Sequence, residues 1–145
     1  MVTPDDKDWT WVLERACPEC GFDTSTVDVA RIGAMVREYA CHVRDVLRIY
    51  LERLDLMLTE DGPHYPNWDQ DTTAVDDRYD IADPAIVAAE LTRSAADLAA
   101  RFDAVRPGQY GRTGFRSDGA SFTIDTFARY FIHDPVHHLW DVRQR

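Results

Sequence analysis

The fold is decided by residues 27–58, "VDVARIGAMVREYACHVRDVLRIYLERLDLML", because their apolar side chains recur at alternating spacings of three and four. That spacing is typical of one amphipathic helix with a single apolar stripe. No proline interrupts the segment, and Gly33 is its weakest helix former. The stripe comprises Val29, Ile32, Val36, Tyr39, Val43, Val46, Tyr50, Leu54 and Met57. We therefore predict one long helix whose apolar face packs on other helices.

Two more helices are predicted in the second half of the chain. Asp83 can cap and Pro84 can open a helix over residues 84–105. Its expected inward-facing residues are Ile86, Val87, Leu91, Ala95, Leu98 and Phe102. The last helix is expected from about Thr123 to near Val142, and its core candidates are Ile124, Phe127, Phe131 and Leu139. Three such helices predict an all-α protein built as a helical bundle.

The remaining segments carry turn-forming residues. Residues 59–82 are rich in Gly, Pro, Asn and Asp, which predicts a long ordered loop over the bundle. Residues 108–122 place turn residues around short apolar positions, which predicts a small hairpin. The sequence has no internal repeat, so we expect one domain over residues 1–145, with residues 1–26 as an N-terminal arm.

The composition limits the partners of the protein. Its 145 residues carry a net charge of −10 with no local basic stripe, so phosphate backbones and anionic membranes repel it. We therefore expect neither nucleic acid nor a membrane as partner. No apolar run has the length of a membrane span and the first residues do not resemble a secretion signal, so we expect a cytoplasmic protein. A chain of this size buries a sufficient core without metal, so a bound metal would be functional before it is structural.

The segment "HDPVHHLW", residues 133–140, carries three of the five histidines. In a continuous helix, His133 and His137 lie one turn apart, so their imidazoles can bind one ion. His42 is the candidate third ligand, because it lies at the margin of the apolar stripe and antiparallel helix packing could bring it opposite the pair. Three protein ligands with one position open to water or substrate are typical of a catalytic zinc site.

Two alternatives stay open at this segment. Either Pro135 kinks the helix and aims the two ligands, or Asp134 caps a fresh helix, which would weaken the one-turn argument. Each histidine alone also fits a structural role in the core or near a helix C-terminus. We interpret the three as a metal site and place His138 beside Asp134, as a second-layer or surface residue. Asp134, Asp45 and Asp141 are candidates to accept the second ring N–H of a ligand.

The chain has three cysteines, an odd number that argues against a disulfide framework in a reducing compartment. Cys17 and Cys20 in "CPECG", residues 17–21, have the spacing of half a zinc knuckle, but no second pair exists to complete it. They could share a site across a dimer or form a redox pair, and we favour a relic or a simple turn. We expect the side chain of Cys41 to pack in the core as a small apolar group.

Several motifs resemble a known family. A helix with a central "H-x-x-D", a capped second helix and a last helix with "H-x-x-x-H" resemble the DinB-like (DinB/YfiT) superfamily of four-helix bundles, to which mycothiol-dependent maleylpyruvate isomerase is related. A likeness to actinobacterial DinB-family proteins rests on "DWTWVLERACPECGFD", "EYACHVRDVL", "PNWDQD", "RSDG" and "YFIHDPVHHLWDV". The resemblance covers most of the chain, and its last segment is the most specific.

The resemblance implies a metal triad, with one histidine from the second helix and two residues four apart in the last helix. These positions match His42, His133 and His137. It also implies zinc or nickel as the ion and thiol-dependent transfer or isomerisation, with mycothiol as the thiol. The first helix of the family is shortened or lost here. We predict that the N-terminal segment with Trp9, Trp11 and Leu13, or the second subunit of a homodimer, fills its place.

From these residues we expect a divalent-metal-dependent enzyme that acts on a small molecule or thiol as a transferase, isomerase or hydrolase. The alternative is a non-catalytic stress-response protein that binds a metal or a small ligand. A third interpretation is an interaction domain in which the histidines are structural.

Overall fold

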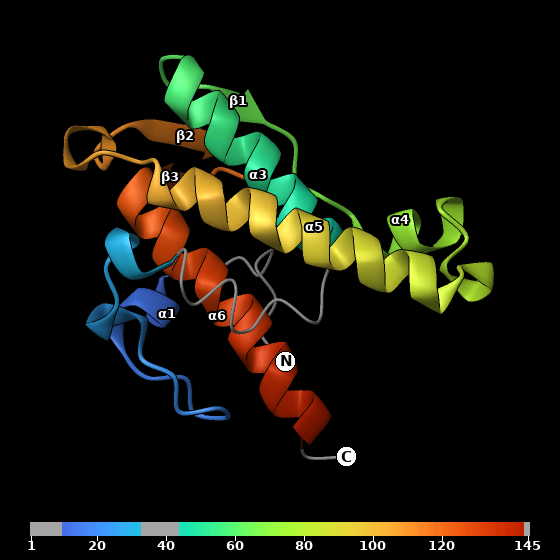
Figure 1. The fold of residues 1–145 in the computed structure, drawn as a ribbon. Coiled ribbons are helices and arrows are strands. Elements are labelled where there is room, and N and C mark those ends of the chain that lie inside the picture. Colours follow the sequence, from blue (N-terminus) through green and yellow to red (C-terminus); the bar gives the residue numbers. More distant parts are fainter. Residues whose placement is uncertain (1–9, 33–43, 144–145) are drawn as a thin grey trace.

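The structure is a computed structural model that describes residues 10–32 and 44–143. In chain order, its elements are α1 (Trp11–Glu14), η1 (Thr24–Thr26), α3 (Arg44–Thr59), β1 (His64–Tyr65), α4 (Gln70–Asp76), η2 (Tyr79–Ile81), α5 (Pro84–Asp103), η3 (Pro107–Gln109), β2 (Thr113–Arg116), β3 (Ser121–Thr123) and α6 (Ile124–Arg143). Residues 29–32 are also helical. The predicted α-helical class is confirmed, and one small sheet is added to it (Figure 1).

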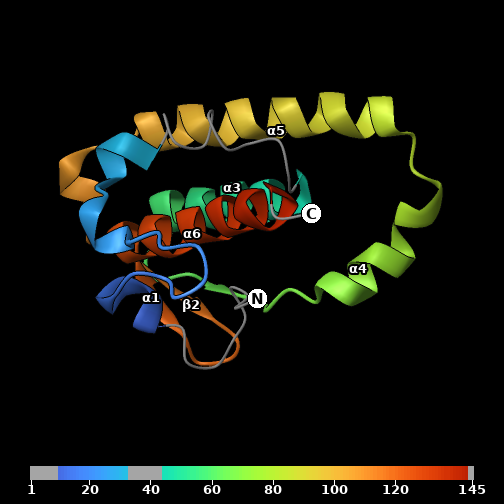
Figure 2. The same ribbon diagram turned by 90° about the horizontal axis from the view of Figure 1, so that it is seen from below.

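Three long helices form the body of the fold. Figure 2 shows α3 and α6 side by side, with α5 along one side of this pair and α1 and β2 on the other. Aromatic rings meet between the helices: the centroids of Tyr50 on α3 and Phe131 on α6 are 4.7 Å apart. Phe102 on α5 stacks on Phe131 at 5.8 Å. These rings hold the helices together, because each buries a large apolar area.

Helix α5 begins at the predicted residues. The side chain of Asp83 accepts a hydrogen bond of 2.8 Å from the backbone N–H of Ala85, and Pro84 is the first helical residue. The residues buried as predicted are Ala95, Leu98 and Phe102. The inward orientation predicted for Ile86 is wrong, since its side chain is 58% exposed. The first turns of α5 border an open pocket beside α4 instead of the core.

The helix predicted over residues 27–58 is described only at its two ends, and its predicted start is two residues early because Val27 has an extended backbone. Residues 29–32 are helical, and α3 covers the C-terminal half of the prediction. The stripe residues buried in α3 are Val46, Tyr50, Leu54 and Met57. The middle of the predicted helix, which holds Cys41 and His42, lies outside the described residues.

The segment between α3 and α5 has more regular structure than the predicted loop. Asp69 caps α4, since its side chain accepts a hydrogen bond of 2.9 Å from the backbone N–H of Thr72. Residues His64 and Tyr65 form β1, which pairs in parallel with β2. The loop prediction is therefore wrong in part, because a local cap and a pairing with a distant strand both order this backbone.

Residues 108–122 contain the predicted hairpin. Strands β2 and β3 pair antiparallel, with Gly114 opposite Phe122. A Cβ atom at Gly114 would lie only 2.8 Å from the Cγ of Met57 on α3. The glycine therefore lets the sheet approach the helix closely.

Helix α6 is continuous through Pro135. The alternative of a fresh helix that begins at Pro135 is wrong, and the one-turn spacing of His133 and His137 is kept. The predicted core residues Ile124, Phe127 and Phe131 are buried, and Leu139 is half-buried. None of the described helices, α6 included, is long and apolar enough to cross a membrane.

Candidate metal centre

Two histidines of α6 share one buried face of the helix. The ring centroids of His133 and His137 are 5.4 Å apart. Their side chains belong to residues that are only 4% and 1% exposed. A single ion can therefore contact both rings, which is the arrangement predicted from the i, i+4 spacing.

The turn that carries Cys17 and Cys20 is closed by backbone hydrogen bonds. The N–H of Gly21 donates to the carbonyl of Cys17 at 2.8 Å, and the N–H of Cys17 donates to the carbonyl of Phe22 at 2.9 Å. Gly21 has a φ of +74°, in the left-handed region that glycine adopts without strain. Cys17 is 2% exposed, and Cys20 is half-buried. The turn thus has a defined shape that does not depend on a ligand.

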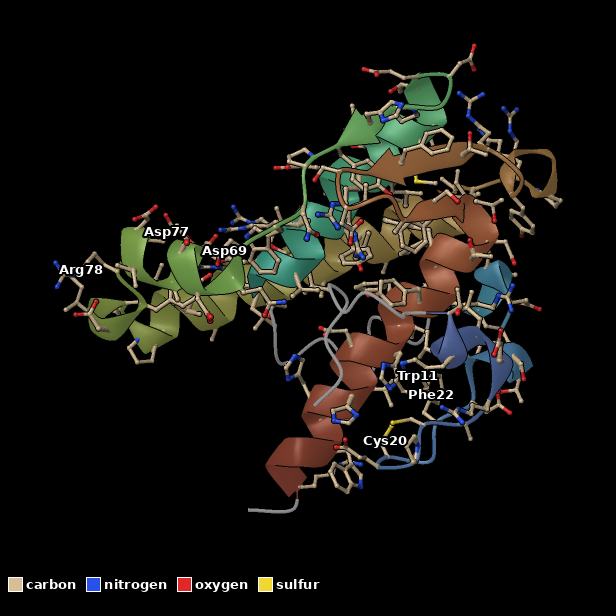
Figure 3. All side chains as sticks on the ribbon, turned by 180° about the vertical axis from the view of Figure 1, so that it is seen from behind. Trp11, Cys20, Phe22, Asp69, Asp77 and Arg78 are labelled. Carbon is tan, nitrogen blue, oxygen red and sulfur yellow. The ribbon has the colours of Figure 1, made fainter. Side chains whose placement is uncertain are left out.

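The N-terminal segment holds this turn against α6. Val12 of α1 is buried, and its carbonyl accepts a hydrogen bond from the hydroxyl of Thr24. The ring of Trp11 meets the ring of His133 edge to face, with centroids 5.7 Å apart. Figure 3 shows Trp11 and Cys20 beside the C-terminal half of α6. This placement agrees with the prediction that the N-terminal segment packs on the bundle; Trp9 lies outside the described residues.

The turn and the helix together bring four metal-binding side chains to one point. One ligand atom from each of Cys17, Cys20, His133 and His137 lies within 4.8 Å of all the others. The Sγ of Cys17 is 3.7 Å from the Nδ1 of His137. Tetrahedral zinc with bonds of about 2.3 Å to sulfur and 2.0 Å to nitrogen separates these two atoms by about 3.5 Å. The observed separation therefore fits a shared ion.

The protonation of His133 also fits a metal ligand. Burial and, second to it, the neighbouring His137 lower the pKa of His133 to about 4, so the ring is neutral near pH 7. The Nε2 atom of His133 is buried and has no hydrogen-bond partner among the described residues. A buried nitrogen in this state costs free energy that a metal bond would remove.

Burial also changes the pKa of Cys20, in the direction that keeps its thiol protonated. Burial raises the pKa of the Cys20 thiol to about 11, and a hydrogen bond from the backbone of Phe22 opposes part of that rise. Without an ion the thiol therefore stays protonated at neutral pH. An ion that binds here must displace this proton, as metal binding to cysteine generally does.

A carboxylate faces the other nitrogen of His137. The Oε2 of Glu19 lies 3.3 Å from the Nε2 of His137, on the opposite edge of the ring from Cys17. Carboxylates in this position fix the orientation and tautomer of a metal-binding histidine. None of the three predicted aspartates is this group. Asp134 lies 3.5 Å from His138 and Asp45 pairs with Arg44, while the side chain of Asp141 lies outside the described ones.

The structure describes two of the three predicted metal ligands. It brings His133 and His137 together and sets His138 beside Asp134 as predicted. The third predicted ligand, His42, lies outside the described residues. Sequence reasoning missed that Cys17 and Cys20 join the two histidines, because it looked for a second cysteine pair. The spacing of "CPECG" pointed to half of a ligand set, and the side chains that approach this turn come from α6.

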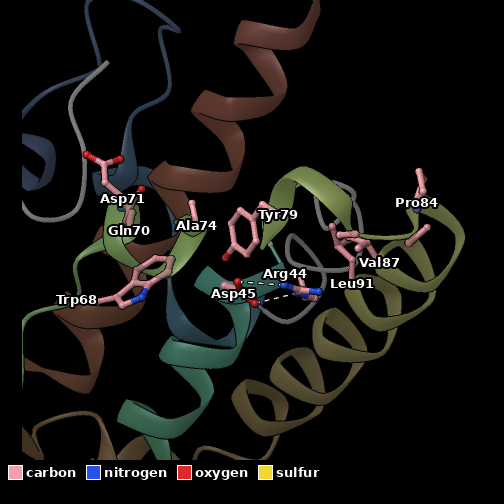
Figure 4. Close-up of a pocket in the computed structure, with 12 residues that line it drawn as sticks. Arg44, Asp45, Trp68, Gln70, Asp71, Ala74, Tyr79, Pro84, Val87 and Leu91 are labelled. Atoms are coloured by element: carbon pink, nitrogen blue, oxygen red, sulfur yellow. Dashed lines mark hydrogen bonds and ion pairs between the residues drawn. The ribbon is translucent and has the colours of Figure 1, made fainter. Parts of the chain in front are cut away.

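A pocket of about 690 Å³ opens on other elements, between α4, α5 and the start of α3 (Figure 4). Trp68 and Tyr79 line it with aromatic rings. Arg44 lies over the Tyr79 ring and donates hydrogen bonds of 2.8 Å to both Asp45 and Glu90. Two carboxylates thus already neutralise this guanidinium, so the surface for a small ligand consists mainly of the two rings and of aliphatic side chains such as Val87 and Leu91.

A family model supplies the identity of this helical region. The model of the DinB superfamily matches residues 25–142, which include α3, α5 and all of α6 except its last residue. The chain belongs to the DinB superfamily. The match begins after the CPECG turn. In this DinB chain, His133 and His137 therefore lie in the matched region, whereas Cys17 and Cys20 lie in the segment before it.

One solved structure has a similar fold. It is YfiT from Bacillus subtilis, described as a probable metal-dependent hydrolase with an unusual four-helix bundle topology. The match has a TM-score of 0.55 and 17% sequence identity, and it covers all of this chain and 90% of that one. Among curated proteins, none matches the chain. At this identity the likeness shows that the DinB chain shares the fold.

The left-handed glycine of the turn gives a test of its preformed shape. We expect Gly21→Ala to lower the free energy of unfolding of the metal-free protein by about 1–2 kcal/mol, because an alanine in this conformation is strained. Among residues 10–32 and 44–143, no atom beyond the chain neighbours lies within 4 Å of the added Cβ, so the expected loss comes from the backbone conformation. Gly21→Asn should lose less, since asparagine tolerates this region better. Urea unfolding measures both, and equal stability of the alanine variant and the wild type would contradict the assignment.

Proposed function

We propose that this DinB protein binds one divalent metal ion, with zinc favoured, between the CPECG turn and α6. The observation that supports this proposal is the convergence of Cys17, Cys20, His133 and His137 within 4.8 Å. Two sulfur and two nitrogen donors make up a ligand set that zinc prefers, and zinc holds such a set tetrahedrally. The neutral state of His133 and the carboxylate of Glu19 behind His137 support the same ion.

A second ligand set shares the two histidines of α6. The family resemblance implies a triad of His42, His133 and His137, which would leave one coordination position open. We propose this triad as the alternative to the cysteine–histidine set. The difference matters for activity, because a catalytic zinc site keeps a position for water or substrate, whereas four protein ligands close it.

We further propose that the ion serves a thiol-dependent transferase or isomerase, or a hydrolase, with mycothiol as the candidate thiol. Bound zinc lowers the pKa of a coordinated water or thiol and so supplies a nucleophile at neutral pH. In the cysteine–histidine set, Cys20 is the least buried of the four ligands, so it is the side chain that can vacate a position. The contrasting function is a non-catalytic protein that binds metal or, in the pocket of Trp68 and Tyr79, a small ligand.

Metal content tests the role of the α6 histidines. We expect tag-free wild-type protein to bind about one zinc ion per chain and His137→Ala to bind it more than about 100-fold more weakly, since loss of a ligand should exceed the loss of a supporting group. His138→Ala is the matched control on the next residue, where the side chain is 23% exposed, and it should keep the ion. Competition with a chromogenic chelator measures the affinities. Equal zinc affinity in both variants would rule out this site.

Two further variants separate the ligand sets. We expect Cys17→Ser to lose zinc and His42→Ala to keep it, because the four donors of the cysteine–histidine set already complete a tetrahedron. The same chelator competition measures both proteins. The reverse pattern, with zinc lost only in His42→Ala, would contradict cysteine ligation and favour the open triad.

Activity is tested with the zinc-loaded protein, mycothiol and a small electrophile. If the ion activates the thiol, the wild type consumes thiol and electrophile together at a rate that His137→Ala does not reach. Loss of free thiol and formation of the conjugate are followed by mass spectrometry. Equal rates for both proteins, despite full zinc loading of the wild type, would favour the non-catalytic function.

A further inference from the structure

The two thiols of the CPECG turn are held together by the backbone and not only by a metal. Both cysteines are free thiols, and the hydrogen bonds between Cys17, Gly21 and Phe22 close the turn around them. Their sulfur atoms lie within 4.8 Å of each other. A disulfide needs about 2.05 Å, so the sulfurs have to approach by less than about 3 Å, which side-chain rotation within one turn can supply.

The two thiols differ in access to solvent. Cys17 is 2% exposed, whereas Cys20 is half-buried, and the neighbouring Glu19 side chain is 45% exposed. A small oxidant therefore reaches Cys20 first. The buried Cys17 lies beside it as a resolving thiol, which is the arrangement that favours a disulfide over further oxidation of a single cysteine.

We propose that Cys17 and Cys20 are a dithiol oxidation site for hydroperoxides, and that their oxidation empties the metal centre. This inference rests on the proposed function, because it requires an ion held by both cysteines and by His133 and His137. It adds that half of the ligand set can be removed reversibly by a two-electron oxidation.

The chemistry balances with hydrogen peroxide as the oxidant. The Cys20 thiolate attacks one peroxide oxygen, the O–O bond breaks, and a sulfenic acid and one water form after one proton is taken up. The Cys17 thiolate then attacks the sulfenic sulfur and displaces hydroxide, which takes up a second proton. In total, two thiolates, one peroxide and two protons give one disulfide and two waters.

Loss of both thiolates changes what can hold the ion. A disulfide has no thiolate to offer, so only His133 and His137 remain of the four donors. Two nitrogen ligands fall short of the three or four protein ligands that zinc sites use, so the ion leaves. Two equivalents of an external thiol reduce the disulfide by exchange and restore the ligand set.

The test uses full-length, tag-free, zinc-loaded protein treated with one equivalent of hydrogen peroxide. We expect one zinc ion released per chain, detected with a chromogenic chelator, together with the loss of two free thiols. Trypsin leaves both cysteines on the peptide of residues 16–31 and Cys41 on a separate peptide, so mass spectrometry identifies the disulfide directly. Reduction followed by added zinc should restore full loading.

A variant of the third cysteine, which lies outside the CPECG turn, serves as the control. Cys41→Ser keeps both thiols of the turn and should release zinc as the wild type does. Retention of zinc after both thiols of residues 16–31 are oxidised would overturn the proposal, and so would release with a disulfide to Cys41 or with a sulfinic acid in place of a disulfide. A wild type that takes up no zinc before oxidation would instead overturn the proposed function, which is measured first on the same sample.

Discussion

Two imidazole rings buried on one face of α6 set the central constraint of this protein. His133 and His137 are almost fully enclosed, and burying polar rings costs free energy unless other groups contact their nitrogens. The N-terminal arm supplies two such groups for His137, the Sγ of Cys17 and the carboxylate of Glu19, and it packs the Trp11 ring against the ring of His133. The arm and α6 therefore stabilise each other, and an ion among the four donors would strengthen the same contact.

Much of the fold follows from local patterns, because helices are governed by short-range rules. The three-and-four spacing predicted α3 and α5, and Asp83 capped α5 where an aspartate before a proline is expected to. The i, i+4 spacing of the two histidines also holds, although Pro135 lies between them. One backbone hydrogen bond lost at a proline does not end a helix whose flanking residues are buried on both sides.

The parts that escaped prediction depend on contacts between distant residues. Cys17 and His137 are 120 positions apart, and no periodicity indicates that they meet. The exposure of Ile86 also depends on distant contacts. A helix pattern shows which residues share a face, but it does not show how far the neighbouring helix extends along that face. Strand β1 was missed because its partner, β2, lies about fifty residues later. His42, in contrast, stays a prediction from motif and position alone.

Cys20 has a role in both reactions proposed for the metal centre, thiol binding and oxidation. A ligand that leaves to admit a thiol substrate and a ligand that meets an oxidant both need access to solvent, and Cys20 has the most access of the four donors. Cys17, His133 and His137 are almost fully buried near the contact of α1 with α6 and provide the fixed part of the site. A substrate thiol and a peroxide would therefore compete for the same exposed sulfur position. If both occur, thiol binding and oxidation exclude each other, so the metal-bound thiol would be consumed in transfer only while the turn stays reduced.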